Sequence, residues 1–365
     1  MKITNLPCIS ISISHFNCDT AFICSEGKKI NLFSVLFQLS VKNMEFPLPS
    51  FAIMAVALLI DLTLGEPPWR PPITIHPTVV INRFVRKILP IFKSGNPKIE
   101  RAKGVLLVVF VTSLTIIAAY VLLRAVRVFN FVAYIIVASL ILKITFCIRL
   151  ETEMAYKAVK YVKEKNVEKS RELASFFSRR ETKNLNEEQI ASAIIESIAE
   201  NLTDFKMSPL FYYAIFGVPG AIAFKTINIL DGTVGFKDKQ HINVGWFSAK
   251  IDTIVNYIPT RIVALLIVLA SAILGEDYRR TWKIALRDHK NVPSRNHGWT
   301  MAAMAGALNV RLEKPGHYVI NNDSIMPSHL DIIRALRIRN MVTILFIILI
   351  VVPLLYLSAG LQFLV

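Results

Sequence analysis

Long apolar runs, separated by polar and basic stretches, dominate the pattern along this chain. A bilayer core about 30 Å thick needs roughly 20 consecutive apolar residues in a helix, because lipid offers a bare backbone no hydrogen-bond partner. Five runs meet or approach that length: residues 47–64, 105–123, 128–148, 254–274 and 341–364. The pattern therefore predicts an all-α, polytopic integral membrane protein with cytoplasmic helical loops.

A sixth apolar segment, residues 209–230, is interrupted by Gly217, Pro219 and Gly220 and contains Lys225. It is either a discontinuous span or a re-entrant hairpin, which is tolerated only where protein or a polar cavity covers its backbone. The basic excess lies in the loops between the runs, and the positive-inside rule places such loops in the cytoplasm of a multi-pass cell-membrane protein. Six crossings place all of these basic loops on the cytoplasmic side, which favours the discontinuous span.

Composition supports the membrane assignment and narrows the partners. The chain has 365 residues, of which 53% are hydrophobic and 19% charged, and its net charge is +16. Soluble domains average about a quarter charged residues. The basic residues flank apolar runs, so the charge does not indicate nucleic-acid binding, although a basic surface suits an anionic substrate. The four cysteines form no C-x-x-C pair and predict neither a disulfide framework nor a zinc site.

The first 43 residues differ from the rest. They are rich in Ser, Ile and Asn and show no sustained hydrophobic period. We expect either an extra N-terminal segment or a translation start at Met44, with residues 44–365 forming a single membrane domain.

Three local patterns predict the connections between apolar runs. Residues 66–103 are rich in proline, which removes amide donors, so we expect a rigid extended connector. Arg124 and Arg127 are expected to mark a tight turn between the second and third runs. Asn186 and Gln189 have the spacing of a capping box at the start of a helix.

The densest polar cluster contains Glu196, Glu200 and Asp204, spaced four residues apart. On a helix this spacing places them on one face. Such a carboxylate ridge can hold Mg²⁺ or steer an amine. The alternative is the solvated face of an amphipathic helix, and spacing alone does not separate the two.

A second cluster follows the broken segment and contains Lys225, Asn228 and Asp231. Ionisable groups at membrane depth are candidates for function, although Lys225 can instead extend towards the interface. Asp252 lies just before the next apolar run, and Trp246 is either part of a site or an interface anchor.

A third cluster, residues 294–299, contains Ser294 and Asn296 and precedes the small residues 302–307. Polar groups at a helix start suit an anion, whereas the alternative is ordinary capping and helix packing. Nucleotide-binding glycine motifs and a zinc-protease motif are absent from the sequence. Residue chemistry alone therefore predicts acidic and anion-binding clusters but no reaction.

Taken in order, these motifs resemble the adenosylcobinamide-phosphate synthase family of cobalamin biosynthesis, known as CbiB or CobD. The resemblance covers roughly residues 44–311 and rests on Asp61 to Pro68, His76-Pro77, Arg180 to Thr182, Glu196 to Asn201, Asp204, Pro209 to Tyr212, Pro219-Gly220, Lys225, Asn228, Leu230-Asp231, Val234-Gly235, Gly245-Trp246, Asp252, Asn256, Ile258-Pro259, Arg261, Ser294, Asn296, Gly298-Trp299 and Ala302 to Leu308. Departures occur at Glu66, Arg179, Arg295 and Met301, where the family often has Asp, Gly, Pro and Glu. The first 43 residues match nothing in the family.

The resemblance implies ATP-dependent amide formation between a carboxylate of adenosylcobyric acid and aminopropanol or its phosphate. It implies ATP and Mg²⁺ as cofactors, with no bound prosthetic group. The expected partners are these substrates, the lipid bilayer and other late-stage cobalamin assembly enzymes, without nucleic acid.

The catalytic assignments that follow from the resemblance are Glu196, Glu200, Asp204 and Asp231, with Glu196 and Glu200 as possible Mg²⁺ ligands. The expected substrate-binding residues are Asp61, His76, Arg180, Asn201, Lys225, Asn228, Trp246, Asp252, Ser294 and Asn296. Among them, Arg180, Lys225 and the 294–296 turn would hold phosphates or the carboxylate.

Two other functions fit a membrane protein of this kind. The same superfamily includes AmpE-like sensors or regulators without ligase chemistry, and a corrinoid transporter is a further alternative. A regulator need not retain Glu196, Glu200, Asn201, Asp231 and Asn296 together, so their joint presence favours the enzyme.

Overall fold

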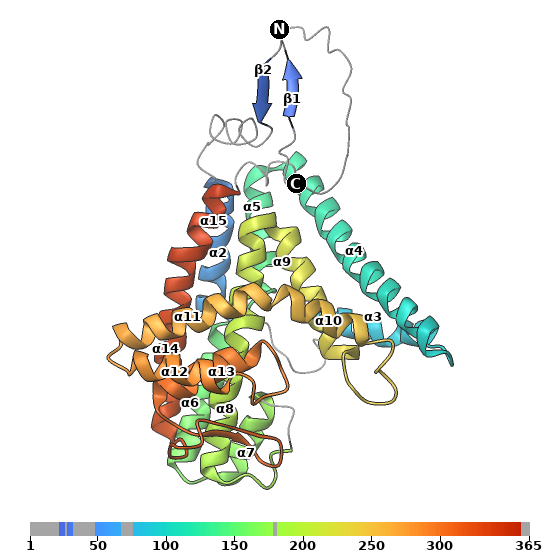
Figure 1. The fold of residues 1–365 in the computed structure, drawn as a ribbon. Helices are drawn as coiled ribbons and strands as arrows, with labels where there is room; N and C mark the ends of the chain where they lie inside the picture. The colour runs from blue at the N-terminus through green and yellow to red at the C-terminus, as the bar shows by residue number, and fades with distance from the viewer. Residues whose placement is uncertain (1–21, 26–27, 32–47, 67–75, 178–180, 359–365) are drawn as a thin grey trace.

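The computed structural model describes residues 22–25, 28–31, 48–66, 76–177 and 181–358 as a long helical assembly (Figure 1). The helices are α2 (Leu48–Leu64), α3 (Pro77–Phe92), α4 (Pro97–Phe129), α5 (Phe131–Lys143), α6 (Arg149–Lys163), α7 (Val167–Phe177), α8 (Glu187–Leu202), η1 (Thr203–Met207), α9 (Ser208–Val234), α10 (Trp246–Val255), α11 (Tyr257–Ile273), α12 (Tyr278–Asp288), α13 (His297–Leu308), α14 (His329–Phe346), η2 (Ile347–Val351) and α15 (Val352–Leu357). Two antiparallel hairpins complete it, β1 (Phe22–Ser25) with β2 (Lys28–Asn31) and β3 (Leu312–Lys314) with β4 (Tyr318–Ile320).

The helices divide into an upright apolar half and a more polar half. Three helical stretches are long and apolar enough to cross a membrane, Pro97–Phe129, Glu187–Val234 and His329–Leu357, and the bent pair α10–α11 is a fourth candidate. Helices α2 and α5 are apolar but shorter. Figure 1 shows α2, α5, α9 and α15 side by side in the upper half, with α4 leaning away, and α6, α7, α8, α12 and α13 below. This distribution agrees with the predicted all-α polytopic membrane protein.

The chain between the first and third apolar runs is more helical than the sequence predicted. The prediction of an extended connector is wrong from Pro77 onward, because the chain there forms α3. This helix is amphipathic, and its Val85 packs against α4 and α9. The predicted turn at Arg124 and Arg127 is also wrong. Both arginines lie within α4, and the turn is at Asn130, whose side chain accepts from the Ala133 amide at 2.9 Å. A single Asn thus ends one helix and caps the next.

Helix α9 is a helical hairpin. Gly217 has φ 68° and ψ −160°, a conformation open essentially only to glycine, and it interrupts the helix. The Tyr212 ring stacks on the Phe224 ring at 5.6 Å, whereas a straight helix would separate them by about 18 Å. Of the two alternatives that the sequence left open, the structure therefore has the hairpin, and its two ends return to the same level.

Helix α8 runs through the centre of the polar half and is enclosed on nearly all sides. Ile190, Ile194 and Ile198 are fully buried, and so is Glu196 on the carboxylate ridge. The alternative of a solvated ridge is therefore wrong at Glu196. The capping box between Asn186 and Gln189 is confirmed, with both reciprocal hydrogen bonds present.

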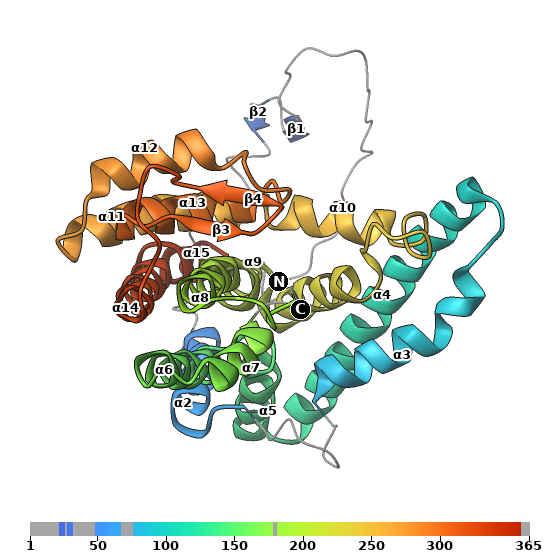
Figure 2. The same cartoon turned by 90° about the horizontal axis from the view of Figure 1, so that it is seen from below.

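Helices α11, α12 and α13 and the β3–β4 hairpin gather on one flank, and α3 and α4 lie on another (Figure 2). The small residues of α13 allow close packing, since a Cβ added to Gly306 would meet the Thr281 backbone on α12 at 2.8 Å. This confirms the packing role expected of residues 302–307.

Candidate functional site

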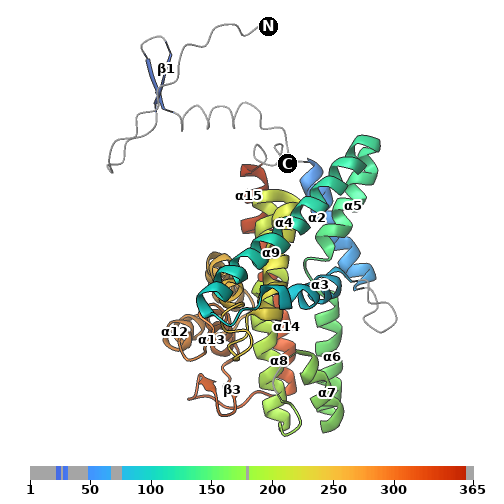
Figure 3. The ribbon, with the colours of Figure 1, turned by 90° about the vertical axis from the view of Figure 1, so that its right-hand side faces the viewer.

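The short π-helix η1 joins α8 to α9 at the base of the upright helices (Figure 3). Single π-turns inside helices occur frequently at functional sites because they redirect side chains. In η1, the consecutive residues Asp204, Phe205 and Lys206 contact three different elements: α13, the second arm of α9, and α6. We refer to Asp204, Lys225, Asp231, Asp252 and His297 as the η1 site.

Asp204 pairs with His297, the first residue of α13. Asp204 Oδ2 lies 3.1 Å from His297 Nε2, and the His297 amide donates to Ser294 Oγ at 3.2 Å. Burial alone would lower the pKa of His297, but the Asp204 carboxylate outweighs it, with smaller contributions from Glu200 and Asp252, and raises the pKa to about 10. His297 is therefore a cation at neutral pH.

The other oxygen of Asp204 has a different environment. Asp204 Oδ1 is buried and has no hydrogen-bond partner among the residues that the structure describes. A buried acceptor left without a donor costs about 1–3 kcal/mol, so such an atom is a candidate for contacting a ligand.

Asp252 connects α10 to the second arm of α9. It accepts hydrogen bonds from Asn228 Nδ2 at 3.3 Å and Asn256 Nδ2 at 3.2 Å. The charges of Asp204 and Asp231 both act on Asp252. Glu200 and Asp252 also act on His297, so three acidic residues lie around one histidine, and Asp231 lies close to Asp252. The hairpin in α9 makes this possible because it returns Asp231 to the level of Asp204.

Lys225 enters the site from the second arm of α9. Its Nζ lies 4.4 Å from the centroid of the Phe205 ring, a cation–π distance. With the residues that the structure describes, Lys225 makes neither a hydrogen bond nor an ion pair within contact distance. A half-buried ammonium group of this kind suits an anionic group of a ligand.

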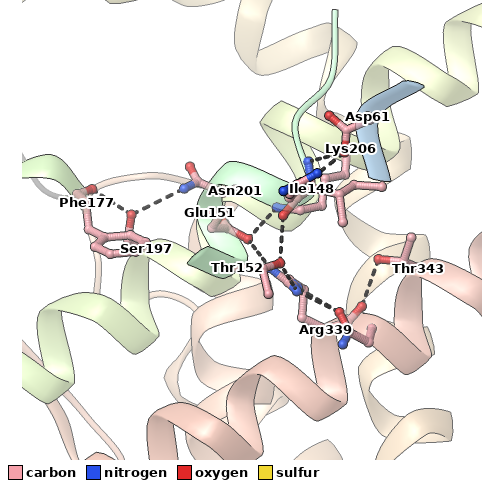
Figure 4. Close-up of polar contacts among 12 residues, drawn as sticks. Asp61, Ile148, Glu151, Thr152, Phe177, Ser197, Asn201, Lys206, Arg339 and Thr343 are labelled. Carbon is pink, nitrogen blue, oxygen red and sulfur yellow. Dashed lines mark hydrogen bonds and ion pairs between the residues drawn. The ribbon is translucent and has the colours of Figure 1, made fainter. Parts of the chain in front are cut away.

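A buried ion-pair network supports η1 from the other side (Figure 4). Glu151 Oε2 lies 2.7 Å from Lys206 Nζ and 2.8 Å from an Arg339 guanidinium nitrogen. Arg339 also donates to Thr152 Oγ1 at 2.8 Å. Burial would raise the pKa of Glu151, but Lys206 and Arg339 outweigh it and hold the pKa below its usual value. This network fixes α6, η1 and α14 relative to one another.

A second ionic cluster adjoins the site at the lower ends of α2 and α5. Asp61 is fully buried, accepts from the Ile148 amide at 3.1 Å and lies 3.3 Å from Lys143 Nζ. Lys143 also pairs with Glu66, whose other oxygen lies 3.3 Å from His76 Nε2. Burial would raise the pKa of Glu66, but the hydrogen bonds from His76 and Lys143 outweigh it and lower the pKa. Asp61 and His76 therefore have structural partners here.

Glu196 and Asn201 face away from the η1 site. Glu196 accepts from Ser192 Oγ at 2.8 Å and from the Tyr318 hydroxyl at 2.6 Å, which ties α8 to the β3–β4 hairpin. Asn201 donates to Ser197 Oγ at 3.4 Å (Figure 4). Within the described parts of the chain, no three His, Cys, Asp or Glu residues are placed to hold a metal ion. The Mg²⁺ assignment of Glu196 and Glu200 stays a prediction, since Mg²⁺ commonly needs only one or two protein carboxylates besides water and substrate phosphates.

The remaining predicted residues lie at the edge of the site or outside it. Asn296 is buried and donates from Nδ2 to the Thr253 carbonyl at 2.8 Å, while its Oδ1 accepts from Arg261. Trp246 is half-exposed at the start of α10, with Lys250 Nζ 5.1 Å from its ring. Arg180 lies outside the residues that the structure describes.

Several residues of this region were missed by the sequence analysis as site residues: Glu66, Lys143, Glu151, Lys206, His297 and Arg339. Lys143 had a usable signal, because a lysine within the apolar run 128–148 is costly unless it is paired. His297 lies within the predicted cluster 294–299, but nothing in the sequence indicated its pairing with Asp204, which is distant in the chain.

Comparison with known proteins gives a consistent result. The family model described as CobD/Cbib protein matches residues 54–345. A relative from Thermoplasma volcanium, named probable cobalamin biosynthesis protein CobD, is 38% identical over 307 residues, covering 84% of this chain and 98% of its own.

Two further relatives agree. The probable cobalamin biosynthesis protein CobD of Methanothermobacter thermautotrophicus is 35% identical over 295 residues, covering 81% of this chain and 95% of its own. The cobalamin biosynthesis protein CobD of Dehalococcoides mccartyi is 33% identical over 276 residues, covering 74% and 86%. No solved structure matches the chain.

Proposed function

The chain belongs to the CobD/CbiB family of cobalamin biosynthesis, and from this premise we propose that it is an acid–amine ligase. In the proposed reaction, a carboxylate of adenosylcobyric acid is joined through an amide bond to aminopropanol or its phosphate, at the expense of ATP. The observation that carries this proposal is the η1 site, where a lysine with no ion-pair partner among the described residues and a charged histidine lie in a cluster of acidic side chains.

The two charge types suit the two substrates of an amide ligation. A carboxylate is a poor acyl donor and needs activation, which ATP supplies as a phosphoryl group. Lys225 and the protonated His297 are the cations that hold the carboxylate, the phosphoryl group or the phosphate of the amine. Asp231 attracts the ammonium form of the amine by charge.

The amine must lose a proton before it attacks the acyl group. Asp204 Oδ1 is the best-placed acceptor because it is buried without a hydrogen-bond partner among the described residues. His297 is unsuited to accept that proton, because its raised pKa keeps it protonated at neutral pH. Holding both substrates in one site also lowers the entropic barrier to their reaction.

The proposal assigns no residue as a ligand of Mg²⁺. Both Glu196 oxygens accept hydrogen bonds from Ser192 and Tyr318, so Glu196 is better explained as a structural residue. We further propose that the η1 site faces the cytoplasm, where ATP is available, in agreement with the basic loops around it.

Complementation tests the reaction. Residues 44–365 would be expressed in cells lacking their cobinamide synthase and supplied with cobyric acid, and corrinoids would be followed by mass spectrometry. We expect the aminopropanol-linked product from the wild-type sequence and from Lys250→Met, which changes an exposed lysine outside the η1 site. A well-inserted protein that yields no product, even with aminopropanol or its phosphate supplied, would contradict the ligase and favour a regulator. Corrinoid uptake into liposomes without a covalent product would favour a transporter.

A further inference from the structure

Helices α10 and α11 carry a continuous row of exposed apolar side chains. Its members are between 41% and 58% exposed and are Ile254, Ile258, Leu265, Leu269 and Ile273. The last four lie on α11, where spacings of four and seven residues place them on one helix face, and Ile254 precedes them on α10, across a bend of 45°. The opposite face of α11 is buried, with Val263, Ile267 and Ala270 packed into the core. The row therefore needs an apolar environment that the described protein does not supply.

The hydrogen bonds at the two ends of α11 show how it lies relative to the upright helices. At its start, Asn256 accepts from Ser208, directly after η1. At its far end, Glu276 pairs with Arg334 at 2.5 Å. Arg334 precedes Arg339 by five residues of α14, about 7.5 Å along that helix, and Arg339 is bridged to η1 through Glu151.

The length of α11 decides its orientation. Its 17 residues span about 25 Å, whereas the levels of its two ends differ by only about 7.5 Å along α14. Helix α11 thus crosses the upright helices instead of running beside them. Figure 1 agrees, because α10 and α11 run across the base of the upright helices, above α12 and α13.

The exposed aromatic residues on these two helices have the character of a membrane interface. Trp246 and Tyr257 are 41% and 57% exposed. Each lies beside a cation, with Lys250 Nζ 5.1 Å from the Trp246 ring and Arg261 Cζ 3.8 Å from the Tyr257 ring. Amphipathic aromatic and basic side chains at the border of an apolar face are typical of helices that lie in the headgroup region.

We propose that α10 and α11 lie in the plane of the membrane, with the exposed row inserted among the phospholipid acyl chains of the leaflet on the η1 side. Residues 254–274, which the sequence predicts to be a span, then do not cross the bilayer. Phospholipid is favoured over a second copy of the chain because exposed apolar residues continue from this face onto α14–α15, at Ile344 and Ile348, in a stretch long enough to span.

Two consequences follow for topology and for the site. The α9 hairpin and the in-plane α11 each return to the side from which they start. Crossings by α2, α4, α5 and α14–α15 then keep the basic loops in the cytoplasm, as six crossings do, and move the loop between α9 and α10 to that side as well. The η1 site lies at headgroup depth, because Asn256 bonds both Ser208 and Asp252. A large, polar corrinoid can then reach it from the aqueous side.

Site-directed spin labelling tests the proposal in the full chain. Cys8, Cys18 and Cys24 would be replaced by Ser. Cys147 would be kept, because burial raises its pKa to about 11 and makes it a poor target for thiol labels. Single labels would be placed with Ile258→Cys, Leu265→Cys and Leu269→Cys in phospholipid nanodiscs. Collisions with oxygen and with a water-soluble nickel chelate would report the depth of each label.

A matched series on a crossing helix supplies the control. Ile344→Cys, Ile348→Cys and Val352→Cys should change in depth by about 1.5 Å per residue along α14–α15. We expect the three α11 labels to be accessible to oxygen at depths within about 6 Å of one another, because α11 drops by only about 7.5 Å over its whole length. A depth change of about 16 Å between 258 and 269 would show a span and overturn the proposal. Protection from both reagents, with spin–spin broadening between copies, would show a protein interface and overturn it equally.

Discussion

The ammonium group of Lys225 lies 4.4 Å from the centroid of the Phe205 ring, although the two residues belong to opposite arms of the hairpin formed by η1 and α9. The contact exists because Gly217 reverses the chain between them. It places an ammonium group without an ion-pair partner among the described residues close to the carboxylate of Asp204. A break in a helix near the far end of the hairpin therefore determines the composition of the site near its base.

Replacing Lys225 by Met should remove product formation while leaving the fold intact. The ammonium group has no ion pair to lose, and Met preserves the apolar stem that contacts Phe205. Loss of one preorganised charge at a reacting centre typically costs about 100-fold or more in rate. Corrinoid product formation in the complementation assay would be compared with Lys250→Met. Equal product from both variants would exclude Lys225 from the site.

The stabilisation of the folded protein by the Asp204–His297 pair should be lost as the pH becomes alkaline. The pKa of His297 is raised to about 10 in the folded protein, against about 6.5 unfolded. The pair therefore contributes fully below about pH 6.5, and its contribution is lost as the pH rises through about 10. Melting temperatures of wild type and His297→Gln in detergent should differ most at about pH 6.5 and converge by pH 11. Parallel curves over this range would contradict the assignment.

Glu151→Gln should be strongly destabilising. It leaves Lys206 and Arg339 buried together without their carboxylate, and removing one partner of a buried pair typically costs about 3–5 kcal/mol. Glu153→Gln is the matched control, because its pair with Arg149 is exposed and worth only about 0.5 kcal/mol. Thermal melts of the two variants give the comparison, and similar losses would mean that the network is unimportant.

Because the pKa of Glu151 is lowered, the ion-pair network should stop stabilising the protein at acidic pH. Because the pKa of Glu151 in the folded protein is below its usual value of 4.5, the stabilisation is present above about that pH and is lost as the pH falls through the folded value. Wild type should therefore lose its advantage over Glu151→Gln in melting temperature only under acidic conditions.

Gly217→Ala should destabilise the hairpin and reduce activity together. A non-glycine residue at φ 68° and ψ −160° is strained by about 1–3 kcal/mol. Opening of the hairpin would also move Lys225 relative to Asp204. Gly95→Ala is the control, because no atom lies within 4 Å of an added Cβ there and its φ is not positive. Unchanged stability and product formation in Gly217→Ala would show that another residue can adopt this turn.

The sequence by itself determined the membrane class and the family, together with most of the helices. Apolar runs near 20 residues leave few alternatives in a bilayer, and the ordered polar motifs identified the CobD/CbiB family. Local chemistry also fixed the capping box at Asn186 and Gln189, because both partners lie within one turn of helix. Asp204, Lys225, Asp231 and Asp252 were proposed from the sequence and lie together.

Only the tertiary structure decided how those helices run and which charges meet. A glycine in an apolar segment is compatible with a kinked span or a hairpin, and the stacking of Tyr212 on Phe224 determines that it is a hairpin. Spacing placed Glu196 with Glu200 and Asp204, yet the π-turn at 203–207 redirects the chain, and Glu196 bonds Tyr318 from a distant strand. The partner of Asp204 is His297, and no local pattern predicts a contact between residues so far apart. Charges far apart in the chain meet where packing brings them together, which hydrophobic periodicity does not encode.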